Sequence, residues 1–291
     1  MRKSLEDVLR QLPINGDYAF TNLRGKFREK IKKKQLRILR DFVHVLKHCL
    51  EPEEEILLSM RGVSPFKILE QLTTGWWIFV IKRCVLVLTN KRILHFPATS
   101  KYGPRDSVSQ IGFNDMEKFK AKRKITFWYK NGLKEVFYQV KNGRKFSSIL
   151  TSMNIASSSP SLQRTRHHLC PKCLSVLKKD FYQCSKCRLD FKDPAVARMC
   201  SIFLPGGGYF YTRHPLLGFF DALVELPLLF FSLLYLAGYI MKRPGYEDGW
   251  LVAAVLGGLL IFEKLITIYH AGHFVAEYIP VEREFRRIAR K

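Results

Sequence analysis

Four cysteines are the residues of this chain whose type and spacing point most directly to chemistry. Cys170 and Cys173 form one Cys-x2-Cys pair, Cys184 and Cys187 form another, and ten residues separate the two pairs. Two thiolates at this spacing bind one ion from a tight loop, and two such loops complete a tetrahedral site. We therefore expect one structural zinc ion, with an iron–sulfur cluster as the alternative. Because four ligands close the coordination sphere, no position remains open for catalysis.

The segment around these cysteines, 168–192, resembles a zinc ribbon. It departs from the common pattern in carrying Leu174 and Arg188 where a glycine often follows each cysteine pair. The chain holds seven cysteines, and the other three stand singly, which suits a reducing compartment better than a disulfide scaffold. The small apolar cover of the ribbon is expected to consist of Leu174, Val176, Phe181 and Tyr182.

Residues 215–241 and 250–270 are predicted to form a transmembrane α-helical hairpin. Twenty helical residues extend about 30 Å, which matches the hydrocarbon thickness of a bilayer. Neither segment carries the polar stripe that marks a helix of a soluble bundle. Basic residues are more numerous outside the hairpin than in its short turn, so the N- and C-termini are expected to be cytoplasmic. The sequence thus predicts a multidomain, multi-pass membrane protein, of the cell membrane if it is bacterial.

Four charged residues lie within these segments, where burying a charge is expensive. Asp221 is expected to lie at the membrane interface and to need no special role. The favoured interpretation pairs Glu225 with Lys264 to lock the hairpin. The alternative is an ion or proton path formed with Glu263, which would require a homo-oligomer because two helices cannot enclose a pore. Close helix approach, within the hairpin or between copies, is allowed by four small residues: Ala253, Ala254, Gly257 and Gly258.

Residues 199–214 precede the hairpin and are too few to span a bilayer. Pro205 and three glycines interrupt this apolar stretch, so we expect an interfacial or re-entrant segment. The run Pro205–Tyr211 resembles the start of small two-span bacterial membrane domains.

Residues 52–155 are rich in strand signals. The apolar runs at 55–60 and 76–81 are interpreted as strands, and residues 84–96 as a hairpin. Asn131-Gly132 joins two further strands in the strongest short hairpin signal of the chain. A short helix is expected to follow.

The run Val85–Leu94 resembles the apolar-Thr-Asn-x-Arg-apolar hairpin of bacterial-type PH-like and GRAM-like domains. The resemblance implies an α+β small barrel of seven or so strands, closed by a terminal helix at Gly143–Met153. It also implies binding of phosphoinositides, membrane surfaces or proteins.

The remaining segments are set apart by composition. Residues 1–51 are predicted to form a basic amphipathic helical region with one long helix over Thr21–Leu50. Residues 156–167 have the serine-rich composition of a linker, and residues 271–291 are expected to form a basic cytoplasmic tail.

Lys and Arg number 49 against 25 Asp and Glu, a net charge of +24, and the whole excess lies in the first 215 residues. Such an excess attracts nucleic acid or an anionic lipid surface. Solvated faces that bind nothing are the other interpretation of such runs. The candidate lipid-binding residues are Lys30, Lys32, Lys33, Lys34, Lys118, Lys120, Lys122, Arg123 and Lys124.

No catalytic motif or catalytic grouping of side chains is apparent, so we do not expect an enzyme. The sequence favours a membrane-anchored cytoplasmic adaptor or scaffold that binds anionic lipid, a protein partner or both. A membrane-tethered nucleic-acid-binding protein is the main alternative, since basic helices and four-cysteine ribbons occur in such proteins.

Overall fold

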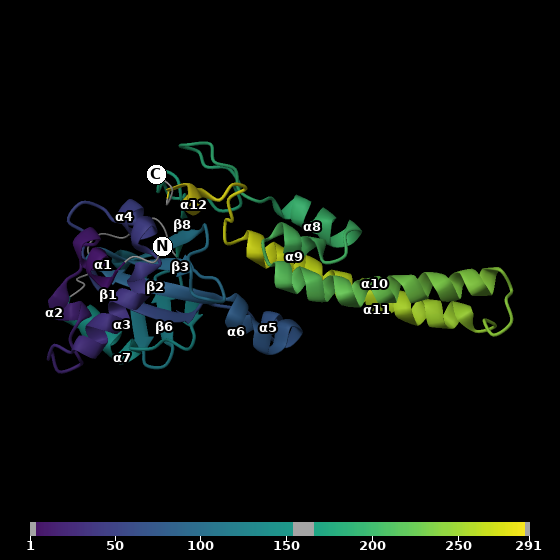
Figure 1. Cartoon of the computed structure of the whole chain (residues 1–291), viewed down its shortest axis with the longest axis horizontal. Coiled ribbons are helices and arrows are strands. Elements are labelled where there is room, and N and C mark those ends of the chain that lie inside the picture. Colours follow the sequence, from purple (N-terminus) through teal and green to yellow (C-terminus); the bar gives the residue numbers. More distant parts are fainter. Residues whose placement is uncertain (1–3, 154–165, 289–291) are drawn as a thin grey trace. The chain divides into compact units, whose positions relative to one another are not determined.

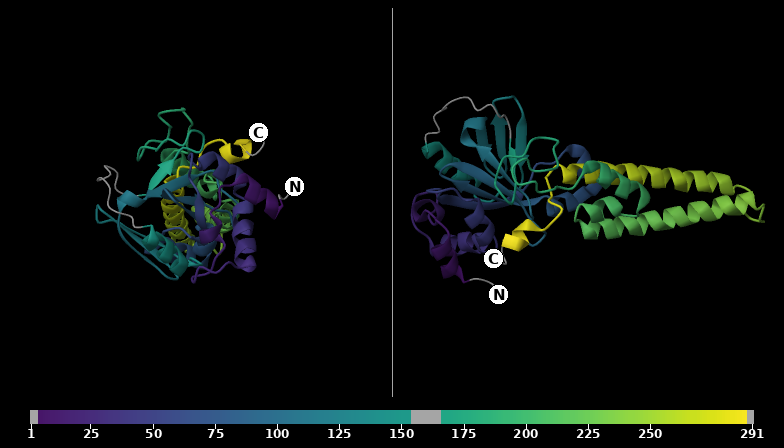
Figure 2. Two further views of the ribbon diagram at one scale, coloured as in Figure 1. Left: turned by 90° about the vertical axis from the view of Figure 1, so that its left-hand side faces the viewer. Right: turned by 90° about the horizontal axis from the view of Figure 1, so that it is seen from above.

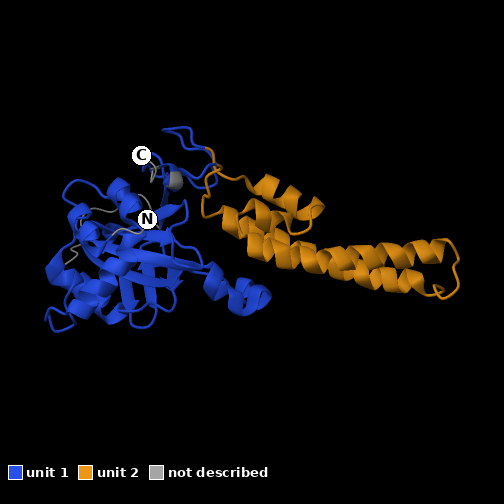
Figure 3. Ribbon diagram, in the orientation of Figure 1, with its two compact units in different colours: residues 1–189, 282–291 blue, residues 190–281 orange. Residues whose placement is uncertain are grey.

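The computed structural model describes residues 4–153 and 166–288. The chain forms two compact units, residues 1–189 with 282–291 (unit 1) and residues 190–281 (unit 2) (Figures 1 and 3). It passes from one unit to the other at Leu189–Asp190 and again at Val281–Glu282. The serine-rich linker predicted at 156–167 lies outside the described residues except for its last two.

Unit 1 contains two antiparallel sheets instead of the expected small barrel. The five-stranded sheet has the order β1 (Ile56–Val63), β2 (Arg83–Thr89), β3 (Arg92–Pro97), β4 (Val108–Gly112), β8 (His167–Leu169). The three-stranded sheet consists of β5 (Met116–Ala121), β6 (Ile125–Tyr129) and β7 (Lys134–Phe137). The sheets do not close into a barrel within the described residues, so the fold is a mixed α/β domain with antiparallel sheets.

Both faces of the five-stranded sheet are buried, which explains why its central strands are continuous apolar runs. In β2, Val85 and Val87 pack in a core with the N-terminal helices. The ribbon of these helices lies along one side of the sheet (Figure 2). The alternate residues Leu86 and Leu88 point to the opposite face and pack with the three-stranded sheet and α7 (Gly143–Ser152). The short C-terminal helix α12 (Glu284–Ile288) contributes Phe285 to the first core.

The prediction of a single helix over Thr21–Leu50 is wrong, because a loop replaces its start and a second interruption separates two shorter helices. Asn22 accepts hydrogen bonds from the backbone N–H groups of Arg24 and Lys26, which stabilises a loop in place of the first helical turns. Phe42 lies at the second break and is fully buried in the core. The N-terminal helices are α1 (Leu5–Gln11), α2 (Gly16–Ala19), α3 (Glu29–Arg40) and α4 (Val43–Cys49).

The prediction of a strand at 76–81 is also wrong. Between β1 and β2 the chain forms α5 (Ile68–Thr74), a 3-10 turn at Gly75–Trp77 and α6 (Ile78–Ile81). The strand preference of aromatic and β-branched residues depends on what packs against them, and here the run belongs to the helical connection between the paired strands β1 and β2.

The two predicted hairpins and the helix that follows them are confirmed. Strands β2 and β3 pair from Cys84–Pro97 to Leu88–Ile93 around the Thr89–Arg92 turn. The Asn131-Gly132 turn joins β6 to β7, with Gly132 at a φ of 80° that suits glycine. Helix α7 occupies nearly the whole range predicted for the terminal helix.

Unit 2 is helical, with α8 (Pro194–Phe203), α9 (Gly207–Tyr211), α10 (Pro215–Ile240) and α11 (Gly249–Val275). By length and composition, α10 and α11 can each cross a membrane. They pack along each other, and Ser232 Oγ donates a 3.0 Å hydrogen bond to the carbonyl oxygen of Ala253. Ala253 is buried and Gly257 faces Ser232, whereas a side chain at Gly258 would meet nothing within 4 Å.

The glycine run between α8 and α9 allows the backbone to pack closely against α10. Gly206 has a φ of 64°, and a Cβ atom there would lie 2.0 Å from the carbonyl oxygen of Gly218. Cβ atoms at Gly207 and Gly208 would lie 2.2 Å and 2.0 Å from atoms of α8. Only glycine fits these contacts, so the broken segment is a tight turn between two short helices.

Candidate functional site

The four predicted metal ligands converge in unit 1, with their sulfur atoms all within 4.8 Å of one another. Cys170 Sγ lies 3.5 Å from Cys187 Sγ, and Cys173 Sγ lies 3.6 Å from Cys184 Sγ. A tetrahedral zinc site with bonds of about 2.3 Å separates its sulfur atoms by about 3.8 Å, whereas a disulfide bond is about 2.05 Å long. All four cysteines are free thiols. Their arrangement is compatible with a metal site.

The two cysteine loops have the same backbone geometry. Leu174 N–H donates to the carbonyl oxygen of Cys170 over 2.8 Å, and Arg188 N–H donates to that of Cys184 over 2.9 Å. Leu174 and Arg188 adopt φ values of 59° and 54°, in the left-handed region that glycine prefers. The chain therefore keeps the usual loop shape although glycine is absent from both positions.

Ser175 lies between the two loops and influences the ionisation of the thiols. Its Oγ is 3.0 Å from Cys173 Sγ and 3.2 Å from Cys184 Sγ. Burial raises the pKa of Cys184, but hydrogen bonds from Ser175 and from backbone N–H groups outweigh burial and lower that pKa to about 6. Burial raises the pKa of Cys170, which is enclosed by the fold. Bound zinc would hold all four cysteines as thiolates.

The cysteine loops are attached to the five-stranded sheet. Leu169, the last residue of β8, pairs with Val108 of β4 and lies in the core beside the N-terminal helices. The backbone N–H of Leu177 donates to the carbonyl oxygen of His168 over 2.9 Å. His48 Nε2 lies 3.0 Å from the carbonyl oxygen of Pro171. The four-cysteine cluster is thus part of the fold of unit 1.

The predicted apolar cover of the ribbon is only partly correct. Leu174 packs against the core of unit 1, but the Phe181 side chain is 64 % exposed and Val176 is exposed as well. Leu177 and Leu189 are buried in their place. Sequence reasoning missed Leu177 and Leu189, and among the predicted cover residues it is Leu174 that packs against the core of unit 1.

The candidate lipid-binding residues lie on two separate elements of unit 1. Those of the first set are on α3, whose other face is buried, and Lys32 is the half-buried member. The second set follows β5 and its turn to β6, and all of its members are exposed. Exposure leaves both sets available to a ligand. The members are Lys30, Lys32, Lys33 and Lys34 on α3, and Lys118, Lys120, Lys122, Arg123 and Lys124 on the second element.

An open hollow of about 540 Å³ adjoins the second basic set. Lys122 and Arg144 provide two cations beside it. The hydroxyl groups of α7 can donate hydrogen bonds to the oxygen atoms of a phosphate. The remaining lining residues are Ala121, Ser147, Ser148, Thr151 and Ser152. Neither Arg144 nor the hydroxyl residues were singled out from the sequence, because only the fold brings α7 beside the end of β5.

A tryptophan flanked by two lysines extends this basic surface across the three-stranded sheet. Lys118 Nζ and Lys134 Nζ each lie 5.6 Å from the ring centre of Trp128. The three residues are cross-strand neighbours on β5, β6 and β7. Period-2 alternation around the Asn131-Gly132 hairpin was the available sequence signal for this grouping.

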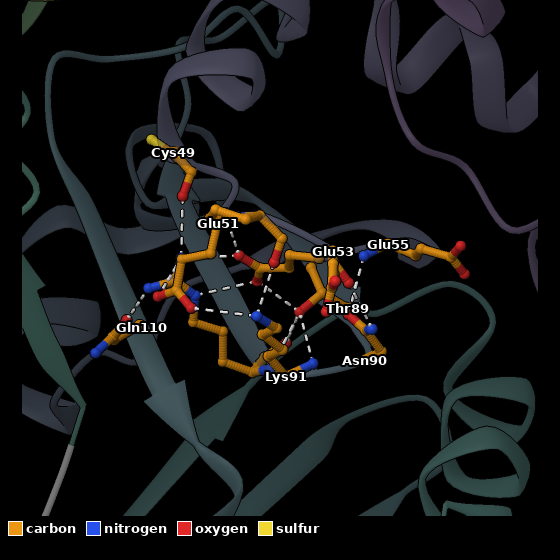
Figure 4. Close-up of polar contacts among 11 residues, drawn as sticks. Cys49, Glu51, Glu53, Glu55, Thr89, Asn90, Lys91 and Gln110 are labelled. Atoms are coloured by element: carbon orange, nitrogen blue, oxygen red, sulfur yellow. Dashed lines mark hydrogen bonds and ion pairs between the residues drawn. The ribbon is translucent and has the colours of Figure 1, made fainter.

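The Thr89–Arg92 hairpin, which carried the resemblance to PH-like domains, is occupied by contacts within the protein (Figure 4). Arg92 donates to Glu54 from Nε at 3.1 Å and from Nη2 at 2.9 Å. Thr89 Oγ1 donates to the same carboxylate over 2.7 Å. The backbone N–H of Glu55 donates a hydrogen bond to Asn90 Oδ1 over 2.9 Å. The acidic segment after α4 therefore closes this turn, and Glu54 is a structural residue that the sequence did not reveal.

In unit 2, Glu225 and Lys264 lie together. Lys264 Nζ is 2.8 Å from Glu225 Oε2, and the same oxygen accepts from Gly206 N–H over 3.0 Å. Lys264 also donates to the carbonyl oxygen of Leu204 over 3.3 Å. Glu225 is 1 % exposed. The pair joins α10, α11 and the glycine turn, a wider connection than the hairpin lock expected from the sequence.

A second polar group lies one helical turn from this pair. Asp221 is buried and accepts hydrogen bonds from Thr267 Oγ1 at 3.2 and 3.1 Å. Thr267 Oγ1 also lies 3.2 Å from the carbonyl oxygen of Glu263. Asp221 has more contacts than a residue left at the membrane interface would have, and the structure brings it and Thr267 together from opposite helices.

Among the described residues, the four cysteines are the one group that could hold a metal ion by geometry. Comparison with protein-family models, with curated proteins and with solved structures finds no match to this chain.

Proposed function

We propose that this chain is a membrane-anchored adaptor whose unit 1 faces the cytoplasm and binds anionic phosphate headgroups. The observation that carries the proposal is the contrast between the two units. Unit 2 has two apolar helices of membrane-spanning length with exposed apolar side chains, whereas unit 1 is a folded domain with exposed basic surfaces. A chain of this kind holds a soluble domain at a membrane surface. The termini are expected on the cytoplasmic side, as the distribution of basic residues indicates.

Zinc is the metal that best fits the four cysteines. Four thiolates in a tetrahedral arrangement favour zinc over harder cations, and a closed set of ligands makes the ion structural. The ion would fix the segment that leads from the edge strand β8 toward unit 2. This role requires no catalytic chemistry, in agreement with the adaptor proposal.

The hollow beside Lys122 supports anionic lipid as the ligand. Proteins bind phosphate with cationic side chains and hydrogen-bond donors, and the hollow is lined by two cations and several hydroxyl groups. The neighbouring lysines add long-range attraction to an anionic surface, at about 1 kcal/mol for each residue near it. Lipid headgroups are the favoured source of the phosphate, because the chain already has a membrane anchor.

Co-flotation of two membranes tests the proposal. The full chain is placed in nanodiscs of neutral lipid and mixed at one physiological salt concentration with vesicles that carry anionic lipid. We expect the nanodiscs to float with anionic vesicles and not with neutral ones. The double variant Lys122→Glu/Arg144→Glu should weaken the association roughly thirtyfold or more, since at least about 2 kcal/mol of attraction is lost.

The matched control carries the same charge change in the turn of the hairpin, Lys242→Glu/Arg243→Glu, and should float like the wild type. Duplex and single-stranded nucleic acid are then added as competitors. If they release the nanodiscs from the vesicles at this salt concentration, the tethered nucleic-acid-binding protein is the correct function. If the chain is extracted from membranes by alkaline carbonate, the anchor itself is absent and the proposal fails.

A further inference from the structure

The excursion between β1 and β2, residues 65–82, carries an apolar surface on unit 1. Its helices α5 and α6 project from the five-stranded sheet (Figure 1). Ile68, Leu72 and Trp76 are 77 %, 75 % and 76 % exposed, and Leu69 and Trp77 are about half exposed. Scattered exposed apolar residues are normal on a protein, but a contiguous group of this size indicates an interaction surface.

An ion pair and aromatic contacts hold the base of the excursion in place, so its apolar residues are exposed on an ordered segment. Glu70 and Lys82 are both buried and form an ion pair of 3.1 Å. Phe66 stacks on Tyr138, with ring centres 4.6 Å apart, and contacts Phe79 edge to face at 5.6 Å. These contacts fix the two ends of the excursion against the sheet while the apolar residues point away from it.

The charges of the excursion suit a bilayer. Lys67, Glu70 and Lys82 are the only charged residues in 65–82. Because the acidic one is buried in an ion pair, the exposed surface carries a single positive charge at Lys67 and no negative charge. Nothing acidic would have to be desolvated or brought against anionic headgroups. Two adjacent tryptophans complete the set, and this residue is enriched where acyl chains meet headgroups.

We infer that the α5–α6 excursion inserts into the boundary between headgroups and acyl chains of the bilayer that anchors the chain. The inference rests on the proposed membrane anchoring. Two chain segments connect the units, at Leu189–Asp190 and at Val281–Glu282. Their ends in unit 2 are hydrogen-bonded to each other, because Val281 N–H donates to the carbonyl oxygen of Asp190 over 3.0 Å. This attachment keeps the bilayer at a high effective concentration for unit 1, so shallow insertion of a few side chains is sufficient.

Tryptophan fluorescence in lipid tests the insertion, because the chain has four tryptophans. The full chain with Trp128→Phe/Trp250→Phe is reconstituted into vesicles whose lipids carry bromine at a shallow or a deep position of the acyl chain. The remaining indoles, Trp76 and Trp77, should lose about half of their fluorescence with the shallow bromines and less with the deep ones.

Two comparisons separate insertion from other causes. Leu72→Glu in the same background should lower this quenching by at least about half, since a charge must leave the acyl region. Its matched control, Leu133→Glu, changes an exposed leucine in the β6–β7 turn and should leave the quenching unchanged. A third chain that keeps only Trp250, at the start of α11, reports whether unit 2 is in the bilayer.

The outcomes distinguish this inference from the proposed function. If bromine quenches Trp250 but not Trp76 and Trp77, the anchor stands and the insertion is wrong. A blue-shifted emission of Trp76 and Trp77 without bromine quenching would show that protein covers the excursion, either another part of the chain or a second copy, and would also overturn the insertion. If Trp250 is not quenched either, the proposed membrane anchoring fails.

Discussion

Removal of the Glu54 carboxylate should destabilise unit 1 strongly. Glu54 is 1 % exposed, and its oxygen atoms accept hydrogen bonds from Arg92, Thr89 and the backbone of Glu51. In Glu54→Ala the guanidinium of Arg92 remains mostly buried and loses its main partner. Breaking such a pair costs about 3–5 kcal/mol. We expect the lower value, because Glu51 Oε1 stays 3.1 Å from Arg92 Nη2.

Thermal unfolding of the full chain in detergent micelles measures this change. In a Trp250→Phe background the remaining tryptophans all belong to unit 1, so their fluorescence reports that unit. A loss of about 3 kcal/mol should lower its Tm by about 6–12 °C, at 2–4 °C for each kcal/mol in a unit of this size. The control Glu117→Ala removes an exposed acid whose nearest cation is 4.0 Å away, and it should change the free energy of unfolding by about 0.5 kcal/mol or less.

The pH dependence provides a second check. Burial raises the pKa of Glu54, but the hydrogen bonds from Arg92, the Glu51 backbone and Thr89 outweigh burial and hold the pKa below its ordinary value. The carboxylate therefore stabilises the folded state fully above the unfolded pKa of about 4.3, and this contribution is lost as the pH falls through the lower folded value. The difference in Tm between wild type and Glu54→Ala should narrow at acid pH. A Tm change below about 2 °C, or one that is the same at pH 7 and pH 3, would refute the buried ion pair.

Three further predictions concern the metal centre and the helical hairpin. The purified chain should carry one zinc per molecule by elemental analysis, and Cys170→Ser should lose it while Cys200→Ser keeps it. Lys264→Met leaves a buried carboxylate unpaired and should cost about 3–5 kcal/mol of unfolding free energy in micelles, whereas Lys242→Met in the exposed turn should be nearly neutral. Arg188→Gly should raise the Tm of unit 1 slightly, by the equivalent of about 1 kcal/mol or less, because glycine relieves the left-handed backbone; a lower Tm would contradict this.

Local patterns were sufficient wherever a feature is encoded by residues close in sequence. Cys-x2-Cys spacing determines which sulfur atoms can share one ion, and this predicted the four-cysteine cluster. The long apolar runs of α10 and α11 predicted two helices of membrane-spanning length, because composition alone sets that property. Asn131-Gly132 predicted its hairpin because few residues other than glycine tolerate the required φ.

Tertiary structure decided the features that depend on what lies against a segment. The run at 76–81 has the composition of a strand, yet it forms part of the helical connection between β1 and β2, which pair directly with each other. The break at Phe42 follows from the core that this ring fills, and hydrophobic periodicity does not encode such a break. Arrangement into two sheets instead of a closed barrel likewise depends on long-range pairing, including the pairing of β8 with β4 across the predicted linker.

The sequence also could not predict all the contacts that individual charged residues make. A run of acids after α4 and a Thr-Asn-Lys-Arg turn give no sign that Glu54 is buried against Arg92, since the strand register brings them together. Glu225 and Lys264 were paired by their depth in two apolar helices, but the third contact, with Gly206, required the glycine turn to fold against α10. Sequence by itself determines which residues can carry charge, bind metal or enter a bilayer. Packing decides which of them meet, because only the folded chain fixes distances between residues that are far apart in sequence.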